Sequence, residues 1–113
     1  METLIVEKPW GKFEQFTHDE QTTVKIITVN PGGTLSLQTH KLRTEFWRVL
    51  SGHPVVTVGD TVTHANPGDE FEIKKTQPHR LGAVDDVVQV LEITHGQFDE
   101  NDIVRLEDNY GRI

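Results

Sequence analysis

Residues 22–52 read TTVKIITVNPGGTLSLQTHKLRTEFWRVLSG, and this stretch decides the fold class. The run Thr22–Val29 is rich in β-branched residues, and Asn30-Pro31-Gly32-Gly33 follows it as a strong turn signal. Apolar and polar residues alternate over Thr34–His40, which is typical of a half-buried strand. A further apolar run, Glu45–Leu50, ends at Ser51-Gly52. The stretch therefore predicts successive strands separated by glycine turns.

Short apolar runs separated by turn residues continue toward the C-terminus. No segment before residue 98 shows the apolar period of 3.6 residues that is typical of a helix. Gly59-Asp60 stands between two apolar runs as a two-residue hairpin signature. Further strands are predicted at Pro54–Val58, Thr61–His64, Glu70–Ile73 and Val87–Ile93. The tail Asp99–Tyr110 is compatible with a short helical turn or an extended edge. We expect an all-β fold, a sandwich or barrel of the jelly-roll kind.

Size and charge narrow the class of protein. The 113 residues and 12.8 kDa predict one domain over residues 1–113, with a core large enough to fold without disulfides. Cysteine is absent, which excludes thiolate zinc sites and a cysteine nucleophile. A net charge of −7 argues against nucleic-acid binding, and no apolar run is long enough to span a membrane. The expected location is the cytoplasm.

A spaced set of residues able to bind a metal is the sharpest chemical signal. Gln38 and His40 lie two apart on one predicted strand, so their side chains share a face. Glu45 begins the next apolar run, and His79 follows the turn at Gly68. Imidazole, carboxylate and amide groups from several strands, with open positions left, are typical of a catalytic metal site. A lone histidine is more often a surface or core residue, so the pair alone is weak support.

The spacing of these residues strengthens the metal hypothesis. Gly32, Gln38, His40, Glu45 and Gly52 are separated by five, one, four and six residues. This frame resembles the first cupin motif, with Gln38 where the commoner members carry histidine. Ten residues separate Gly68 from His79, the spacing of the second cupin motif. Its usual Pro, Gly and Asn are replaced here by Lys74, Thr76 and Ala83.

A more specific resemblance covers nearly the whole chain in order. The sequence is similar to the cupin domain of mannose-6-phosphate isomerases that occur fused behind a mannose-1-phosphate guanylyltransferase. The matching segments are Lys8-Pro9-Trp10-Gly11, Val24-Lys25, Pro31-Gly32, Leu35-Ser36-Leu37-Gln38, the run from Gln38 to Trp47, Ser51-Gly52, His79-Arg80-Leu81, Leu91-Glu92-Ile93 and Asp102–Arg112. The guanylyltransferase domain is not among them.

The resemblance implies a single-domain cupin with Gln38, His40, Glu45 and His79 as metal ligands. It implies interconversion of mannose 6-phosphate and fructose 6-phosphate, an aldose–ketose isomerisation in which a divalent cation stabilises an enediolate oxygen. Zinc is the first expectation, and manganese, cobalt, nickel or iron suit the same atoms.

Charged residues near the ligands are the candidates for substrate contact and proton transfer. Arg43 and Arg80 stand beside ligands and are expected to bind the phosphate or an oxygen of the sugar. Arg80 and Lys25 are also candidate catalytic cations. Glu92 interrupts an apolar strand and is the candidate acid/base. Each could instead be an ordinary solvated charge.

Two other functions stay open at this stage. One is a non-enzymatic cupin that binds a metal and a carbohydrate, and the other is a different cupin enzyme such as a dioxygenase. The expected partner is a small sugar or sugar phosphate, with no nucleic acid and no membrane. A homodimer is also expected, since the sheet edges of a short jelly roll need cover and Glu2–Val6 could pair across a two-fold axis.

Overall fold

The computed structural model describes residues 2–113 and builds them from strands and connecting turns. The strands are β1 (Leu4–Lys8), β2 (Gly11–Gln15), β3 (Thr22–Val29), β4 (Leu37–Thr39), β5 (Arg43–Ser51), β6 (Val55–Val58), β7 (Thr61–His64), β8 (Glu70–Ile73), β9 (His79–Gly82), β10 (Val88–Gly96) and β11 (Val104–Glu107). Within this described part the chain forms no helix, and so none that could cross a membrane. The all-β prediction is confirmed.

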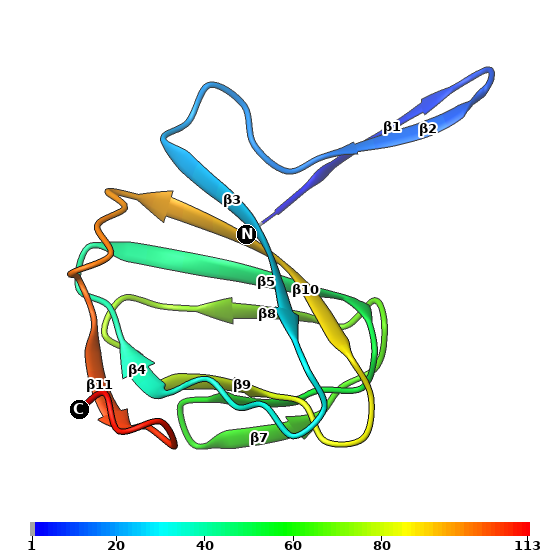
Figure 1. Cartoon of the computed structure of the whole chain (residues 1–113). Helices are drawn as coiled ribbons and strands as arrows, with labels where there is room; N and C mark the ends of the chain where they lie inside the picture. Colours follow the sequence, from blue (N-terminus) through cyan, green and yellow to red (C-terminus); the bar gives the residue numbers. More distant parts are fainter. Residues whose placement is uncertain (1) are drawn as a thin grey trace.

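Two antiparallel sheets make the body of the molecule (Figure 1). One has the order β3-β10-β5-β8 and the other the order β11-β4-β9-β6-β7. Trp47 and Val49 of β5 and Val88 and Val90 of β10 are buried between the sheets, where they pack against Leu81 of β9. A separate two-stranded sheet, β1-β2, projects away from both (Figure 1).

The turn residues fall where the sequence places them. Val58 pairs with Thr61, so Gly59 and Asp60 form the two-residue loop of the β6–β7 hairpin. Gly52 has a φ of +80°, and a Cβ built on it would lie 2.4 Å from the carbonyl oxygen of Val87. The Ser51-Gly52 turn therefore requires glycine both for its backbone conformation and for the close passage of the chain before β10.

Several boundaries differ from those predicted. Only Leu37–Thr39 of the predicted strand 34–40 forms a regular strand, β4. Thr34, three residues before it, makes an isolated bridge to Gly82. The tail contains an extended edge strand, β11, rather than a helical turn. The strand predicted at Val87–Ile93 continues to Gly96, and the strands β1, β2 and β9 are additional to the prediction.

The strand register sorts the inward side chains of the first sheet into layers. Val90 lies opposite Val49 and Ile27, which belong to the apolar layer. Glu92 lies opposite Trp47 and Lys25 in the next layer. Glu45 lies one layer further, opposite Thr94. The interior thus changes along the strands from an apolar end to a polar end, and the polar end holds the predicted site.

Candidate metal centre

Three of the predicted ligands converge at the polar end of the barrel. Nitrogen or oxygen atoms of His40, Glu45 and His79 all lie within 4.8 Å of one another. The Nε2 atom of His40 is 3.1 Å from Oε1 of Glu45, and Nε2 of His79 is 3.7 Å from Oε2 of Glu45. All three residues are almost fully buried. His40 directly follows β4, whereas Glu45 lies on β5 and His79 on β9, so strand pairing brings together residues far apart in sequence.

Backbone carbonyls hold both imidazole rings. Nδ1 of His40 is 2.7 Å from the carbonyl oxygen of Asp102, and Nδ1 of His79 is 2.9 Å from that of Gln77. In a neutral imidazole Nδ1 is then the donor, so the lone pair of Nε2 faces Glu45. Burial lowers the pKa of His79 and so favours its neutral form. Both rings therefore present Nε2 as a ligand atom.

The donor set fits a divalent cation. Among the described residues, Nε2 of His79 and Oε2 of Glu45 are buried without a hydrogen-bond partner. The Arg43 guanidinium, with its Nε 3.2 Å from Oε1 of Glu45, favours the ionised form of this buried carboxylate. An ionised carboxylate beside the His79 lone pair, which lacks a donor, is satisfied by a metal ion.

Gln38, the fourth predicted ligand, lies beside this cluster. It pairs with His79 across the β4–β9 ladder, and its side-chain oxygen accepts a hydrogen bond of 3.1 Å from the Ser36 hydroxyl. The structure therefore places Gln38 next to a ligand, and its part in metal binding stays a prediction.

Arg43 lies inside the cluster rather than at its rim. Its Nε is 3.2 Å from Oε1 of Glu45, and its Nη2 donates to Nε2 of His40 over 3.2 Å. Its Nη1 donates to the carbonyl oxygen of Asp99. The guanidinium supplies positive charge at two of the three ligands, which offsets the buried charge of Glu45.

Glu92 is buried in the layer below. Trp47 Nε1 donates to Glu92 Oε2 over 3.0 Å, and the Trp47 ring meets His79 edge-on. Burial raises the pKa of Glu92 to about 7, and the charge of Glu45 acts in the same direction. Both protonation states of Glu92 are populated near neutral pH, as an acid/base group requires.

Phe98 covers the cations beside the cluster. Lys25 Nζ lies 4.1 Å from the centre of the Phe98 ring, and the Arg43 guanidinium lies 4.5 Å from it. Lys25 also stands opposite Glu92 in the β3–β10 ladder. The predicted residues Lys25, Arg43 and Glu92 therefore belong to one neighbourhood.

Arg80 lies outside this neighbourhood. Its Nε donates to the carbonyl oxygen of Leu35 over 2.9 Å, and its Nη1 pairs with Glu107 over 3.0 Å. Arg80 follows His79 directly on β9, and adjacent strand residues point to opposite faces. The guanidinium instead joins β9 to the Leu35 segment and to β11.

Asp102 is a site residue that the sequence patterns do not single out. Its carboxylate accepts hydrogen bonds of 2.8 and 2.9 Å from the amides of Lys41 and Leu42, and its carbonyl oxygen holds His40. It therefore ties the tail to the segment just after a ligand. No spacing signal could reveal this, because 62 residues separate Asp102 from His40.

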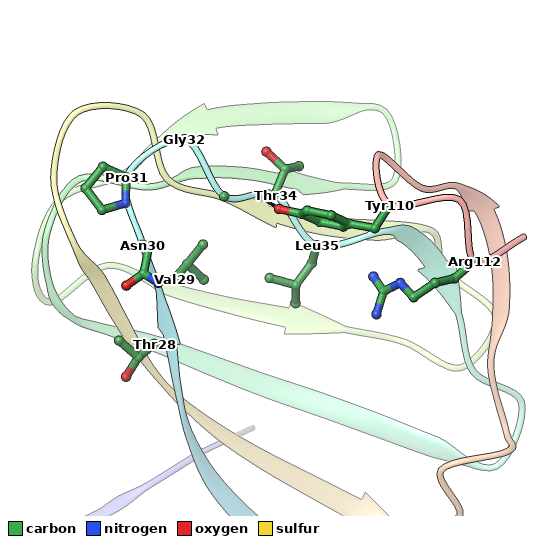
Figure 2. A pocket seen from close by; sticks show the side chains of 10 residues that line it. Thr28, Val29, Asn30, Pro31, Gly32, Thr34, Leu35, Tyr110 and Arg112 are labelled. Carbon is green, nitrogen blue, oxygen red and sulfur yellow. Dashed lines mark hydrogen bonds between the residues drawn. The ribbon is translucent and has the colours of Figure 1, made fainter.

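A separate hollow of about 610 Å³ lies between the turn after β3 and the C-terminal tail (Figure 2). Tyr110 closes one side, its hydroxyl accepting a hydrogen bond of 3.4 Å from the Thr34 amide. Arg112 also lines it and pairs with Asp108 over 2.8 Å. None of the residues that line it is a predicted site residue.

Known sequences resemble this chain over its length. The family described as mannose-6-phosphate isomerase C-terminal matches residues 2–108. The xanthan biosynthesis protein XanB of Xanthomonas campestris pv. campestris is 40% identical over 109 residues, which cover 95% of this chain and 23% of XanB. The mannose-1-phosphate guanylyltransferase ManC of Salmonella typhimurium is 36% identical, with 96% and 23% covered. The chain thus spans less than a quarter of the length of these relatives.

Solved structures resemble it in fold. Oxalate decarboxylase of Bacillus subtilis superposes with a TM-score of 0.70 at 24% identity, covering 77% of this chain and 24% of that one. A cupin-2 domain of Rhodospirillum rubrum, Rru_A2000, gives 0.65 at 20% identity, covering 89% and 77%. A protein described as a putative sugar phosphate isomerase from Acidithiobacillus ferrooxidans gives 0.61 at 20% identity, covering 67% and 51%. The fold is a cupin, as predicted.

Proposed function

Because this chain belongs to the family of mannose-6-phosphate isomerase C-terminal domains, we propose that it is a metal-dependent sugar-phosphate isomerase that interconverts mannose 6-phosphate and fructose 6-phosphate. The observation that carries the proposal is the buried cluster of His40, Glu45 and His79, in which two ligand atoms lack a hydrogen-bond partner among the described residues. An isomerase of this kind needs a metal site with a proton-transfer group nearby, and Glu92 is buried one layer below Glu45.

His40, Glu45 and His79, with Gln38 beside them, would hold the metal, and zinc is the first choice for these nitrogen and oxygen ligands. A divalent cation bound there would supply Lewis-acid stabilisation of the enediolate oxygen. Two neutral imidazoles and one carboxylate leave a 2+ ion with a net positive charge, which suits an oxyanion.

Glu92 carries the proton in this proposal. Its carboxylate removes the proton from the carbon beside the carbonyl of the open-chain sugar, and the resulting carboxyl returns it to the neighbouring carbon. A pKa of about 7 allows both steps near neutral pH. Trp47 orients the carboxyl group through its hydrogen bond.

Lys25 and Arg43 are the cations proposed to meet the phosphate or a sugar oxygen, since both contact the Phe98 ring beside the cluster. Entry of a sugar phosphate then requires Phe98 to move off them. Arg80 is left out of this role because it adjoins His79 on β9 and its side chain points to the opposite face. We place the reaction in the cytoplasm.

The test is an assay of the chain stripped with a chelator and reloaded with zinc, manganese, cobalt, nickel or iron in turn. Mannose 6-phosphate and fructose 6-phosphate should interconvert with at least one metal. His79→Ala should abolish the reaction, whereas His64→Ala, which changes an exposed histidine on β7, should not. No interconversion above the His79→Ala background with any of these metals would refute the proposal.

A carbohydrate-binding cupin without turnover is the second candidate. The second cupin motif favours it, because Lys74, Thr76 and Ala83 replace the usual Pro, Gly and Asn of that motif. Calorimetric titration of the loaded chain with mannose 6-phosphate separates the two functions. Binding without product formation supports this candidate against the isomerase.

A further inference from the structure

Arg105 lies on the edge strand β11, on the face of its sheet that carries His79. It pairs with Gln38 on β4, and Gln38 pairs with His79 on β9. Side chains that stand opposite each other in antiparallel strands project from the same face of the sheet, so Arg105 shares the inward face of the metal centre. Its neighbours Val104 and Leu106 are 47% and 48% exposed, as expected for side chains on the outer face.

Arg105 differs from the other arginines because its Nε has no acceptor. Arg105 is half-buried, and its Nε is buried without a hydrogen-bond partner among the described residues. The other arginines each pair with a carboxylate: Arg43 with Glu45, Arg48 with Glu14, Arg80 with Glu107 and Arg112 with Asp108. A buried donor without an acceptor is costly, and an anion that binds beside it would supply the acceptor.

The strand that carries Arg105 is fixed on both sides of it. Before it, the carboxylate of Asp102 accepts hydrogen bonds from the two amides that follow His40. After it, Glu107 pairs with Arg80 over 3.0 Å. The register of β11 against β4 also shifts directly after Arg105, and such bulges redirect side chains next to functional sites. The backbone of Arg105 is therefore held in place before a ligand arrives, which lowers the entropy cost of binding.

The position of Arg105 suits the far end of a sugar phosphate. Neighbouring strands lie about 4.8 Å apart, so two strand spacings, about 10 Å, separate the backbones of Arg105 and His79. In the proposed reaction the carbonyl end of the open-chain sugar meets the metal, and the phosphate lies at the other end of the carbon chain. A long side chain on the same face can therefore meet the phosphate while the carbonyl end stays at the cluster.

The other cations near the cluster are less suited to the phosphate. Each guanidinium nitrogen of Arg43 already has a partner in the cluster or in the segment after β10. Lys25 offers a single ammonium group, which lies against the Phe98 ring. A planar guanidinium with free donors binds two phosphate oxygens at once. Lys25 and Arg43 are then left for the oxygens of the sugar.

We propose that Arg105 binds the phosphate group of the substrate and so selects phosphorylated sugars over free ones, an inference that rests on the isomerase function proposed above. The guanidinium donates to the phosphate oxygens, and the phosphate provides the acceptor that Nε of Arg105 lacks. Strand β11 thereby takes a direct part in substrate specificity, and the contacts of Asp102 and Glu107 hold it there.

A stability measurement separates this role from a structural one. Arg105→Met keeps a long side chain without the donors, and it should leave the Tm of the ligand-free chain unchanged or higher, because no hydrogen bond of Nε is lost. Arg80→Met, which removes a hydrogen bond to Leu35 and an ion pair with Glu107, should lower the Tm by about 4 °C or more. An equal fall in Arg105→Met would show a structural role and overturn the proposal.

Calorimetric titration of the zinc-loaded full chain tests the binding role. Mannitol 6-phosphate has no carbonyl group and cannot isomerise, so its binding is measured without turnover. It should bind more tightly than mannitol, and Arg105→Gln should weaken it about 10-fold or more while leaving mannitol binding unchanged. Arg105→Lys should restore part of the difference. Lys12→Gln, which removes one exposed positive charge from β2, should bind both compounds as the unmodified chain does.

The outcomes distinguish this inference from the function on which it rests. Weakened binding of mannitol 6-phosphate to Arg105→Gln, in a chain that does not interconvert sugar phosphates, would support Arg105 as the phosphate-binding residue and refute the isomerase. Interconversion by the unmodified chain, together with full binding of mannitol 6-phosphate by Arg105→Gln, would overturn the inference and keep the isomerase. Equal binding of mannitol and mannitol 6-phosphate by the unmodified chain would also overturn the inference.

Discussion

Arg43 supplies a positive charge at the cluster of His40, Glu45 and His79, where a bound metal would otherwise supply it. Its guanidinium contacts Oε1 of Glu45 and Nε2 of His40, which are the same atoms that a metal ligand set would use. The buried carboxylate is thereby compensated when no metal is bound. Arg43 should therefore stabilise the metal-free chain and compete with the metal.

Replacing Arg43 with Gln should test both effects. Loss of one partner of a buried ion pair costs about 3 kcal/mol, which should lower the metal-free Tm by about 10 °C or more for a domain of this size. The rise in Tm on adding zinc should become larger, because zinc then replaces the lost charge. Lys75→Gln, which changes an exposed cation in the turn between β8 and β9, is the control. An unchanged metal-free Tm would contradict the role of Arg43.

Asp102 is expected to act as a positioning residue for His40. Asp102→Ala removes the acceptor for the Lys41 and Leu42 amides and loosens the segment that follows His40. Loss of such outer contacts weakens metal binding about 10-fold or more. Competition with a chromophoric chelator measures the change. Asp99→Ala, which removes a local bond to the Asn101 amide, should bind metal as the unmodified chain does.

At the scale of elements, the attachment of the β1–β2 hairpin should depend on pH. The hydrogen bond from Arg48, assisted by Thr3, lowers the pKa of Glu14 from 4.5 to about 2. A carboxyl group whose pKa is lowered by folding stabilises the fold at pH values above its pKa in the unfolded chain. This contribution is lost as the pH falls through its pKa in the folded chain. The hairpin should thus loosen between about pH 4.5 and pH 2.

Hydrogen exchange of the β1 and β2 amides measures this loosening. Glu14→Gln should make their protection weaker at neutral pH and nearly independent of pH over the same range. Glu7→Gln, on the same face of the hairpin, should keep the pH dependence. Equal protection of the unmodified hairpin above and below this range would contradict the expectation.

The turn between β5 and β6 makes a second prediction about an element. Gly52→Ala should destabilise the fold by at least about 2 kcal/mol, since left-handed backbone is unfavourable for alanine and its Cβ would meet Val87. Gly68→Ala has a similar φ of +92° but open space around it, so it should cost only about 1 kcal/mol. Urea unfolding compares the two, and equal costs would show that the contact with Val87 is unimportant.

For the whole molecule, metal binding and folding should be coupled. The predicted ligands lie on β5, on β9 and just after β4, in both sheets, so only the assembled barrel brings them together. Zinc at 100 times its dissociation constant should add about 2.7 kcal/mol to the free energy of unfolding. His79→Ala should lose this gain and His64→Ala should keep it in thermal melts. If zinc raised the free energy of unfolding equally in both variants, zinc would bind somewhere other than this cluster.

The strand class and most turns could be predicted because they are local. Alternating residues and paired turn residues determine which way neighbouring side chains point, and Gly59-Asp60 forms the expected hairpin. The convergence of His40, Glu45 and His79 could also be predicted, since their spacing matches a known frame. The β1–β2 hairpin was not predicted. Tertiary packing, and not a local pattern, decides how it sits on the barrel and which of its faces stays exposed.

The sequence by itself determined the all-β class, the turn positions and the three residues of the buried cluster, because each follows from local alternation or spacing. Only the tertiary structure decided which cations reach the cluster. Arg43 lies two residues from Glu45 on β5 and shares its face, whereas Arg80 adjoins His79 on β9 and points away. The partners of each charged group, including Asp102 for the segment after His40, depend on strand pairing across long stretches of chain. Local patterns do not specify that pairing, since many registers satisfy the same alternation.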